Sequence, residues 1–209
     1  MAFIVRRLGI TDYHTTWRSM QAFTSSRNNL TPDEIWLTEH HPIYTLGLNR
    51  KDVNLPRRSD IKLIEVDRGG KITYHGPGQI VIYLLIDLGR LNLSVRQLVT
   101  IMENSIINLL SKYGIEGNTR ANAPGVYIMD KKIASLGLRL KNMCCYHGLS
   151  LNVNMNLTPF DSIDPCGYKG MKITQLTNHT ENMNVEDAGE ILLLKLIEIL
   201  EPLDRRWHA

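Results

Sequence analysis

Helical periodicity occurs in only three stretches of this 209-residue sequence, and short strand-like stretches occupy most of the chain between them. The clearest helix is predicted over residues 94–113, where apolar residues recur every three or four positions and Ser94 and Gln97 have the spacing of a capping box. Two more helices are predicted over residues 12–27 and 185–200. A doubly wound fold needs a helix after nearly every strand, so the pattern predicts an α+β, or mixed α/β, fold.

Strands are predicted where short runs of β-branched and aromatic residues lie between turn-forming residues. A tight turn at Asp130-Lys131 is expected to join two of them, and the polar or proline-containing stretches 49–60 and 156–172 are expected to be loops. The predicted strands are residues 3–7, 34–38, 43–46, 62–66, 79–87, 125–129, 132–140 and 146–153.

The composition is that of one globular domain, with 43% hydrophobic and 22% charged residues. The longest apolar run, residues 80–86, is too short to span a membrane, and the N-terminus lacks the apolar region of a signal peptide. Three cysteines, two of them adjacent, do not make a disulfide scaffold and favour a reducing compartment. The net charge of +3 comes without a block of Lys and Arg. We therefore expect a single cytoplasmic domain over residues 1–209, with no nucleic-acid partner.

Residues 68–79, RGGKITYHGPGQ, form the densest glycine cluster in the chain. The cluster is compatible with a loop that lines a pocket, because glycines let a backbone approach a ligand closely, and equally with a plain turn between strands. A phosphate-binding loop is disfavoured, since the Gly-x-x-x-x-Gly-Lys-Ser/Thr pattern is absent and a strand, not a helix, is predicted to follow.

Two residues could carry nucleophilic chemistry. Lys132 opens a predicted strand, where a lysine is either a solvated edge charge or, when desolvated, a base or a partner for a thiolate. Cys166 lies between a proline and a glycine, and is either a small buried hydrophobe or a nucleophile presented on a turn. A reactive thiol needs an electropositive setting, which His75, His147 or Lys132 could supply.

The segment Cys144-Cys145-Tyr146-His147 suggests a zinc site at first sight. Structural zinc normally takes four ligands from pairs such as Cys-x-x-Cys, and neighbouring strand residues point to opposite faces. We therefore expect no metal there.

Several segments together resemble the octanoyltransferases of lipoate biosynthesis, which belong to the biotin/lipoate protein ligase superfamily. They occur in the family's order and spacing between about residues 39 and 172. The segments are 39–42 with 44–47, 68–79, Arg120 with 123–127, 132–138, 147–149, 152–154 and 165–168.

The resemblance implies a fold and a site. The fold would be a mixed β-sheet flanked by helices, as in the biotin and lipoate protein ligases. The site would contain a dyad of Cys166 and Lys132, with no metal and no cofactor. The acyl pocket of the family would fall on Arg68, Gly69, Gly70, Lys71, Ile72, Thr73, Tyr74, His75, Ser135, Leu136, Gly137, Gly148, Leu149 and Ser150.

The resemblance also implies a reaction, the first step of endogenous protein lipoylation. Octanoyl would pass from octanoyl-acyl carrier protein to Cys166 as a thioester, and then to a lysine on a lipoyl domain of a 2-oxoacid dehydrogenase or on the glycine cleavage H protein. Lys132 would favour the thiolate or accept a proton. Because such partners are acidic, we expect Arg57, Arg58, Lys71 and Lys169 to contribute to docking.

Three other functions remain open at this point. An ATP-dependent lipoate or biotin ligase would need no cysteine nucleophile, a non-catalytic binding module would need no activated thiol, and an amidotransferase would take octanoyl from another lipoyl-type domain. Loss of transfer on replacing Cys166, fast alkylation of its thiol, and preference for the carrier-protein donor would separate these from the transferase.

Overall fold

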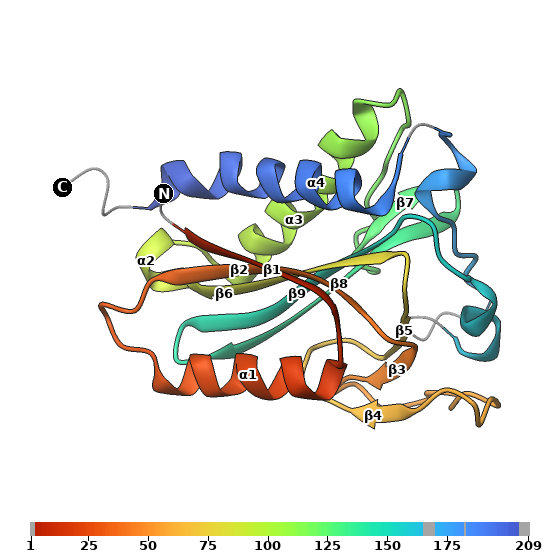
Figure 1. Cartoon of the computed structure of the whole chain (residues 1–209), viewed down its shortest axis with the longest axis horizontal. Coiled ribbons are helices and arrows are strands. Elements are labelled where there is room, and N and C mark those ends of the chain that lie inside the picture. Colours follow the sequence, from red (N-terminus) through yellow and green to blue (C-terminus); the bar gives the residue numbers. More distant parts are fainter. Residues whose placement is uncertain (1–2, 165–169, 182, 205–209) are drawn as a thin grey trace.

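A computed structural model gives the fold (Figure 1) and describes residues 3–164, 170–181 and 183–204. Two sheets organise the chain: a six-stranded sheet in the order β1-β2-β6-β9-β8-β7 and a three-stranded sheet in the order β4-β3-β5. The β1–β2 and β3–β4 pairs are parallel and the other pairs are antiparallel, so both sheets are mixed, as predicted. The strands are β1 Phe3–Thr11, β2 Asp33–His40, β3 Ile43–Leu46, β4 Leu63–Glu65, β5 Ile72–His75, β6 Gln79–Asp87, β7 Val126–Ile128, β8 Lys131–Lys141 and β9 Cys144–Asn152.

Helices cover both faces of the larger sheet (Figure 1). The helix α1, Tyr13–Ser26, lies on one face, and α3, Val95–Ser111, and α4, Val185–Leu200, lie on the other. The strand β6 runs between them with alternating sides: Ile82 packs in the core beneath α3 and α4, and Tyr83 packs in the core beneath α1. None of the helices in the described ranges is long and apolar enough to cross a membrane.

The three predicted helices are confirmed, and so is the capping box predicted for the second of them. Asp12 accepts a hydrogen bond from the Thr15 amide at the start of α1, and the capping box of Ser94 and Gln97 opens α3. Asn184 caps α4, which covers the predicted range. The start of a helix can be predicted from the sequence in such cases because the capping hydrogen bond joins residues only three positions apart.

Two local predictions were wrong, and two short elements were not predicted. The turn before β8 consists of Met129 and Asp130 rather than Asp130-Lys131, because Met129 takes a left-handed backbone with φ of 52° and Lys131 already pairs with Ile128. The strand β5 within the glycine cluster and the short helix α2, Leu88–Leu91, were not predicted. The predicted loop 156–172 contains a 3₁₀ helix, Thr158–Ser162.

Candidate active site

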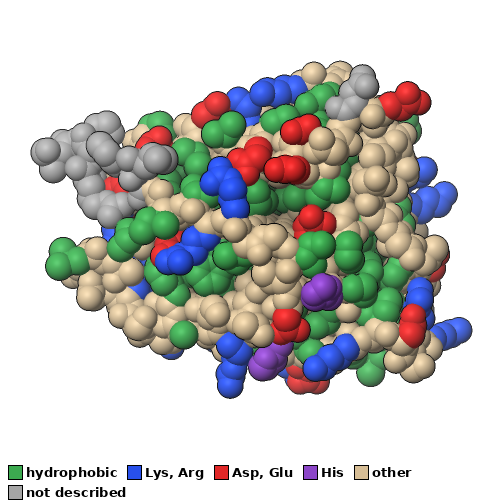
Figure 2. Space-filling view, viewed as in Figure 1, with side chains coloured by type: hydrophobic (Ala, Val, Ile, Leu, Met, Phe, Trp, Pro, Cys, Tyr) green, Lys and Arg blue, Asp and Glu red, His purple; other side chains and the backbone are tan. Residues whose placement is uncertain are grey.

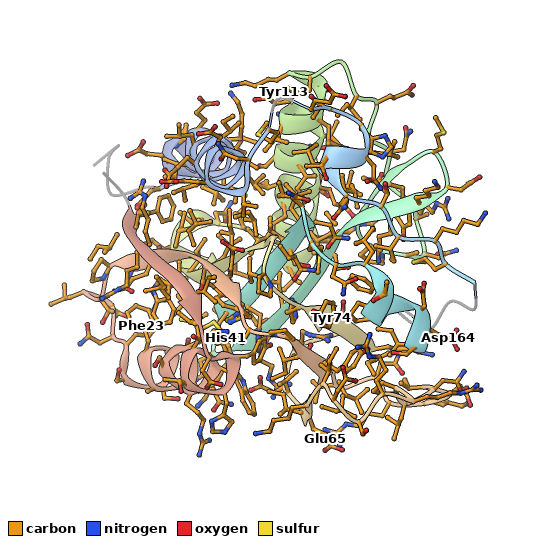
Figure 3. The ribbon with its side chains drawn as sticks, turned by 45° about the vertical axis from the view of Figure 1, so that its right-hand side comes forward. Phe23, His41, Glu65, Tyr74, Tyr113 and Asp164 are labelled. Carbon is orange, nitrogen blue, oxygen red and sulfur yellow. The ribbon has the colours of Figure 1, made fainter. Side chains whose placement is uncertain are left out.

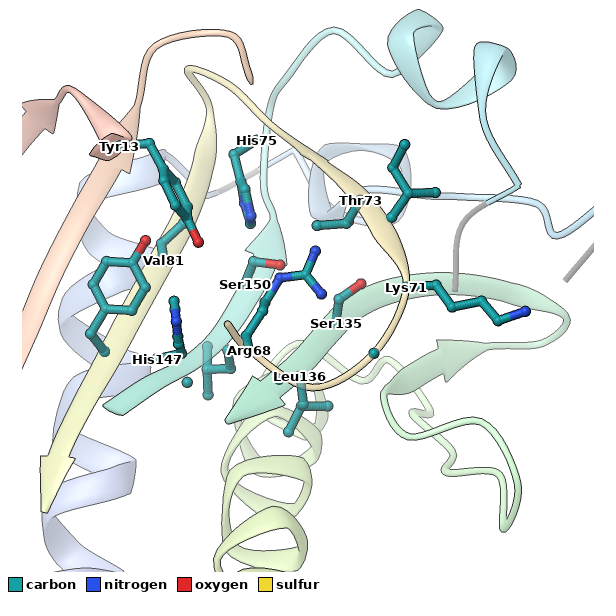
Figure 4. A pocket seen from close by; sticks show the side chains of 16 residues that line it. Tyr13, Arg68, Lys71, Thr73, His75, Val81, Ser135, Leu136, His147 and Ser150 are labelled. Carbon is teal, nitrogen blue, oxygen red and sulfur yellow. The ribbon is translucent and has the colours of Figure 1, made fainter. Parts of the chain in front are cut away.

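Nearly all the residues predicted for the acyl pocket line one cavity on the α1 side of the larger sheet (Figure 4). The exceptions are Gly69 and Tyr74. The space between the lining side chains, including its open mouth, is about 470 Å³. In Figure 4 Arg68 lies between Ser150 and Ser135, and the Lys71 side chain points away from the cavity. The glycine cluster is therefore a pocket wall and not a plain turn.

The floor of the cavity depends on a glycine in a close-packed part of the sheet. Gly148 on β9 faces Gly137 on β8 and Tyr83 on β6. A Cβ atom at Gly148 would lie 2.1 Å from the Ile82 carbonyl oxygen, so no larger residue fits without a backbone shift.

Arg68 holds the glycine-rich wall in shape from inside. Its guanidinium donates through Nη2 to the backbone oxygen and to the Oγ1 of Thr45, each at 2.8 Å, and through Nη1 to the Gly69 carbonyl at 2.9 Å. The side chain is buried, so these hydrogen bonds replace its lost hydration. Arg68 therefore ties the glycine segment to β3.

Lys132 is buried, with 1% of its surface exposed, so the solvated edge charge considered for it is wrong. Its ammonium lies 5.4 Å from the centroid of the Tyr127 ring. Gly125 leaves room for the lysine side chain, because a Cβ there would lie 2.5 Å from Lys132 Cε. The Gly125 amide in turn donates to Glu103 of α3 at 3.0 Å.

Cys166 lies outside the described residues, together with Pro165, Gly167, Tyr168 and Lys169. The chain on its C-terminal side runs beside Lys132: the Lys132 amide donates to the Lys172 carbonyl at 2.8 Å, and the Thr174 amide donates to the Lys132 carbonyl at 2.9 Å.

On the N-terminal side of Cys166, the 3₁₀ helix Thr158–Ser162 is packed against the smaller sheet. The Tyr44 hydroxyl donates to the Pro159 carbonyl at 2.8 Å, and Phe160 packs edge-on against Tyr74 at 5.5 Å between ring centroids. Figure 3 shows Asp164, the last described residue before the cysteine, at the right-hand edge of the lower half of the molecule, with Tyr74 nearer the middle.

Both histidines offered above as cationic partners for the thiol are neutral. Burial, together with the nearby His40 and Arg68, lowers the pKa of His75 to about 3, although its hydrogen bond with Gln79 acts in the opposite direction. Burial also lowers the pKa of His147, although Asp67 acts in the opposite direction. Of the three candidates named from the sequence, Lys132 is the one that is left.

His147 is oriented by a carboxylate. Its Nε2 lies 3.0 Å from Asp67 Oδ1. Burial disfavours the charged form of Asp67, but hydrogen bonds from His147, Tyr146, Gln21 and Trp17 hold the pKa of this carboxyl well below its usual range. Asp67 is thus an acceptor, and the neutral His147 carries its proton on Nε2.

The cavity has four lining residues that the pocket prediction missed. They come from the start of α1, from β6 and from β9, and no short motif joins them. Two hydroxyls among them are shielded from ionisation, since burial raises the pKa of Tyr13 to about 12 and that of Tyr83 well above its usual value. Only the alternation of β6 could have indicated that its odd-numbered residues share a face. The four residues are Tyr13, Val81, Tyr83 and His147.

The two described cysteines are unsuited to thiolate chemistry. Cys145 is buried in the core, which raises its pKa to about 12, and partial burial also raises the pKa of Cys144. In the part of the chain that the structure describes, no three His, Cys, Asp or Glu side chains gather as a metal site.

Comparisons with known proteins agree with this geometry. The profile of the lipoyl protein ligase A/B catalytic domain matches residues 12–197. An octanoyltransferase of Dechloromonas aromatica (strain RCB) is 52% identical over 198 residues, which are 95% of this chain and 97% of the relative. One from Laribacter hongkongensis (strain HLHK9) is 55% identical over 189 residues, 90% of this chain and 91% of the relative. The chain belongs to the octanoyltransferase family.

Solved structures outside the octanoyltransferases share the fold. A bi-partite lipoate protein ligase from Thermoplasma acidophilum superposes with a TM-score of 0.76 at 14% identity, over 96% of this chain and 84% of the other. Biotin protein ligase from Aquifex aeolicus in complex with biotin and ATP gives a TM-score of 0.61 at 13% identity, over 97% and 72% of the two chains. The predicted fold, a mixed sheet flanked by helices as in these ligases, is confirmed.

Proposed function

We propose that this chain, an acyltransferase by its family, moves octanoyl from octanoyl-acyl carrier protein to a lysine of a lipoyl domain through a thioester on Cys166. The observation that carries the proposal is that Lys132 is buried and its backbone is hydrogen-bonded to Lys172 and Thr174, which follow Cys166 in the sequence. Lys132 lies at one end of β8, and the middle residues of this strand line the cavity. We take residues 1–209 as one catalytic domain for this reaction.

In the first half-reaction Cys166 loses its proton to form the thiolate, which the charge or basicity of Lys132 favours. The thiolate sulfur attacks the carbonyl carbon of the donor thioester and expels the thiolate of the carrier, which takes up a proton. One thioester replaces another, so the exchange needs no ATP.

In the second half-reaction the neutral amine of the acceptor lysine attacks the Cys166 thioester. The C–S bond breaks as the C–N bond forms, the proton lost from the amine is accepted by Lys132, and the cysteine thiolate is regenerated. An amide is more stable than a thioester, so this step draws the sequence to completion.

The cavity suits an alkyl chain along its walls. Ile72, Val81, Leu136 and Leu149 supply apolar surface, and Gly148 leaves the space between them open. Because His75, Tyr13 and Tyr83 are neutral, an alkyl chain in the cavity would meet no charge on those side chains.

For docking of the acidic carrier and lipoyl domains we propose four basic residues, Arg57, Arg58, Lys71 and Lys169. Arg57 is exposed, Lys71 points out of the cavity, and Arg58 is paired with Asp60 at 2.6 Å. Lys169 lies outside the described residues. Figure 2 shows acidic and basic side chains interspersed on one face, so the attraction would be local.

The free thiols of Cys144 and Cys145 suit the reducing cytoplasm, where we place the reaction.

The deciding test is intact mass after mixing the protein with octanoyl-acyl carrier protein in the absence of ATP. We expect the mass of one octanoyl group to be added, to be removed by hydroxylamine, and to be absent from Cys166→Ala. Cys144→Ala is the matched control and should still be acylated. Octanoylation of a lipoyl domain only when ATP and free octanoate are supplied would mean that the chain is a ligase.

A further inference from the structure

A chain of buried polar side chains connects the cavity to the backbone of Lys132. Its central members are two amides, Gln79 on β6 and Asn152 on β9, which are 1% and 5% exposed. Both occur in segments that carry the family resemblance, and neither lines the cavity. The full series of hydrogen-bonded residues is Arg68, Thr45, His75, Gln79, Asn152 and Thr174.

The orientation of both amides follows from their partners. The Asn152 amide nitrogen donates to the Thr174 carbonyl at 3.0 Å, so the Asn152 Oδ1 is an acceptor. The Gln79 amide nitrogen uses its two hydrogens on that Oδ1 at 2.9 Å and on the Tyr74 carbonyl at 3.2 Å. The remaining Gln79 oxygen must accept, and it does so from His75 Nδ1 at 2.7 Å.

The hydrogen-bond directions at His75, Thr45 and Arg68 follow in the same way from their partners. Neutral His75 with its proton on Nδ1 has a lone pair on Nε2, which lies 3.5 Å from the Thr45 hydroxyl. That hydroxyl already accepts from Arg68, so its own hydrogen is directed to His75. Every donor therefore points the same way, from Arg68 to the Thr174 carbonyl, and aligned hydrogen bonds of this kind strengthen one another.

This series of hydrogen bonds ends at Thr174, which is hydrogen-bonded to the backbone of Lys132. Thr174, whose carbonyl receives the last hydrogen bond, donates its own amide to the Lys132 carbonyl, and the Lys132 amide donates to Lys172. The wall of the cavity and the backbone of the lysine are thereby joined through side chains of fixed orientation. Packing alone would not require amides here, because replacing both partners of a buried hydrogen bond by apolar groups of the same shape is nearly neutral for stability.

We infer that Gln79 and Asn152 are positioning residues, which set the place of Lys132 and of residues 172–174 relative to the acyl group bound in the cavity. The inference rests on the proposed function of Lys132 and Cys166. It predicts that breaking the amide pair lowers turnover more than it lowers donor binding, because small displacements of reacting groups are costly to rate.

The test compares Asn152→Asp with Asn154→Asp. Aspartate at 152 can accept from Gln79 but cannot donate to Thr174, whereas Asn154, two residues further on, is exposed. For Asn152→Asp we expect kcat per folded molecule to fall about 10²-fold with the KM for octanoyl-acyl carrier protein changed less than about twofold. Asn154→Asp should keep wild-type values. If Asn152→Asp does not fold, Gln79→Met, which removes the amide at similar length, takes its place with the same expectation.

Hydrogen exchange of the backbone amides of Lys132 and Thr174 gives a readout that does not depend on activity. We expect faster exchange at both in Asn152→Asp and wild-type exchange in Asn154→Asp. A wild-type protein that transfers no octanoyl would refute the proposed function, while the exchange rates would still decide whether the amides hold Lys132. The inference is wrong if the exchange and kcat of Asn152→Asp match those of Asn154→Asp, or if activity falls only with the folded fraction.

Discussion

The two faces of the six-stranded sheet differ in how many polar side chains they bury. Toward α3 and α4 the buried side chains are almost all aliphatic, such as Ile82, Ile106 and Leu196. Toward α1 and the smaller sheet the interior includes His40, His75 and other buried polar groups, and it contains the cavity. The first face can be repacked by any residues of suitable shape, whereas the second is specified by hydrogen bonds and is where chemistry is possible.

The largest effect that separates the faces is expected at Lys132. Lys132→Ala should lower octanoyl transfer by about 10²–10⁴-fold, the range of a lost acid–base group, with the change concentrated in kcat. Transfer from octanoyl-acyl carrier protein to a lipoyl domain measures it, and Lys131→Ala, at the exposed neighbouring position, is the control. Lys132→Arg keeps the charge but cannot act as a base, so wild-type turnover in that variant would leave the lysine a purely electrostatic role.

The aliphatic face should respond in stability and not in rate. Leu196→Ala removes a fully buried side chain of α4, which should cost about 2–5 kcal/mol in the free energy of unfolding. Denaturant unfolding measures this loss, and the kcat of the folded fraction should stay at the wild-type value. Leu194→Ala, on the same helix but 54% exposed, should be close to neutral. A lower kcat in folded Leu196→Ala would break the contrast between the faces.

Gly148 tests whether the floor of the cavity tolerates a side chain. Gly148→Ala places a methyl group against the Ile82 carbonyl, and the resulting shift should cost about 1–3 kcal/mol in unfolding free energy and reduce transfer. Gly69→Ala, whose Cβ would meet its nearest neighbour at an ordinary 3.4 Å, should cost less. Equal thermal midpoints for the two variants would contradict the tight floor.

The smallest effect is a pH dependence confined to the polar face. His75 has a folded-state pKa of about 3 and His40 of about 4, against 6.5 as the ordinary value. The unfolded chain binds more protons than the folded chain below pH 6.5, so their contribution to stability is present above that pH and is lost as the pH falls toward the folded values. Between pH 6 and pH 5 each should lower the free energy of unfolding by up to about 1.4 kcal/mol per unit.

Urea unfolding at pH 7, 6 and 5 measures this slope. His75→Gln should reduce it, while Leu196→Ala should leave it unchanged because Leu196 carries no titrating group. A slope in His75→Gln equal to that of the wild type would mean that His75 does not stay neutral in the folded protein.

The contrast also explains what could be predicted from the sequence. The bounds of α4 and β6 were predicted to the residue, since periodicity and caps are local signals. The strand β5 was missed because the glycines around it indicate a turn, although pairing with β3 makes it a strand. The turn before β8 was misplaced by one residue because Met129, an unusual residue for left-handed backbone, occupies it.

The candidate site divides in the same way. The resemblance to a family predicted most of the residues that line the cavity, because these residues fall in contiguous segments. The catalytic role of Lys132 stays a prediction. The resemblance did not indicate Tyr13 or Tyr83, which reach the cavity only through the packing of α1 on the sheet. It also did not indicate that His75 and His147 are neutral, since a histidine's charge depends on burial that only the fold creates.

The hydrogen bonds that hold Lys132 between Lys172 and Thr174 have a consequence for the order in which the enzyme is made. The lysine is synthesised some forty residues before its backbone partners, and Cys166 also follows it along the chain. A nascent chain that stops short of these residues has neither the proposed nucleophile nor the backbone hydrogen bonds that hold the lysine. Under the proposed mechanism, acyl transfer would therefore begin only after the chain has been synthesised beyond Thr174 and residues 172–174 have paired with Lys132.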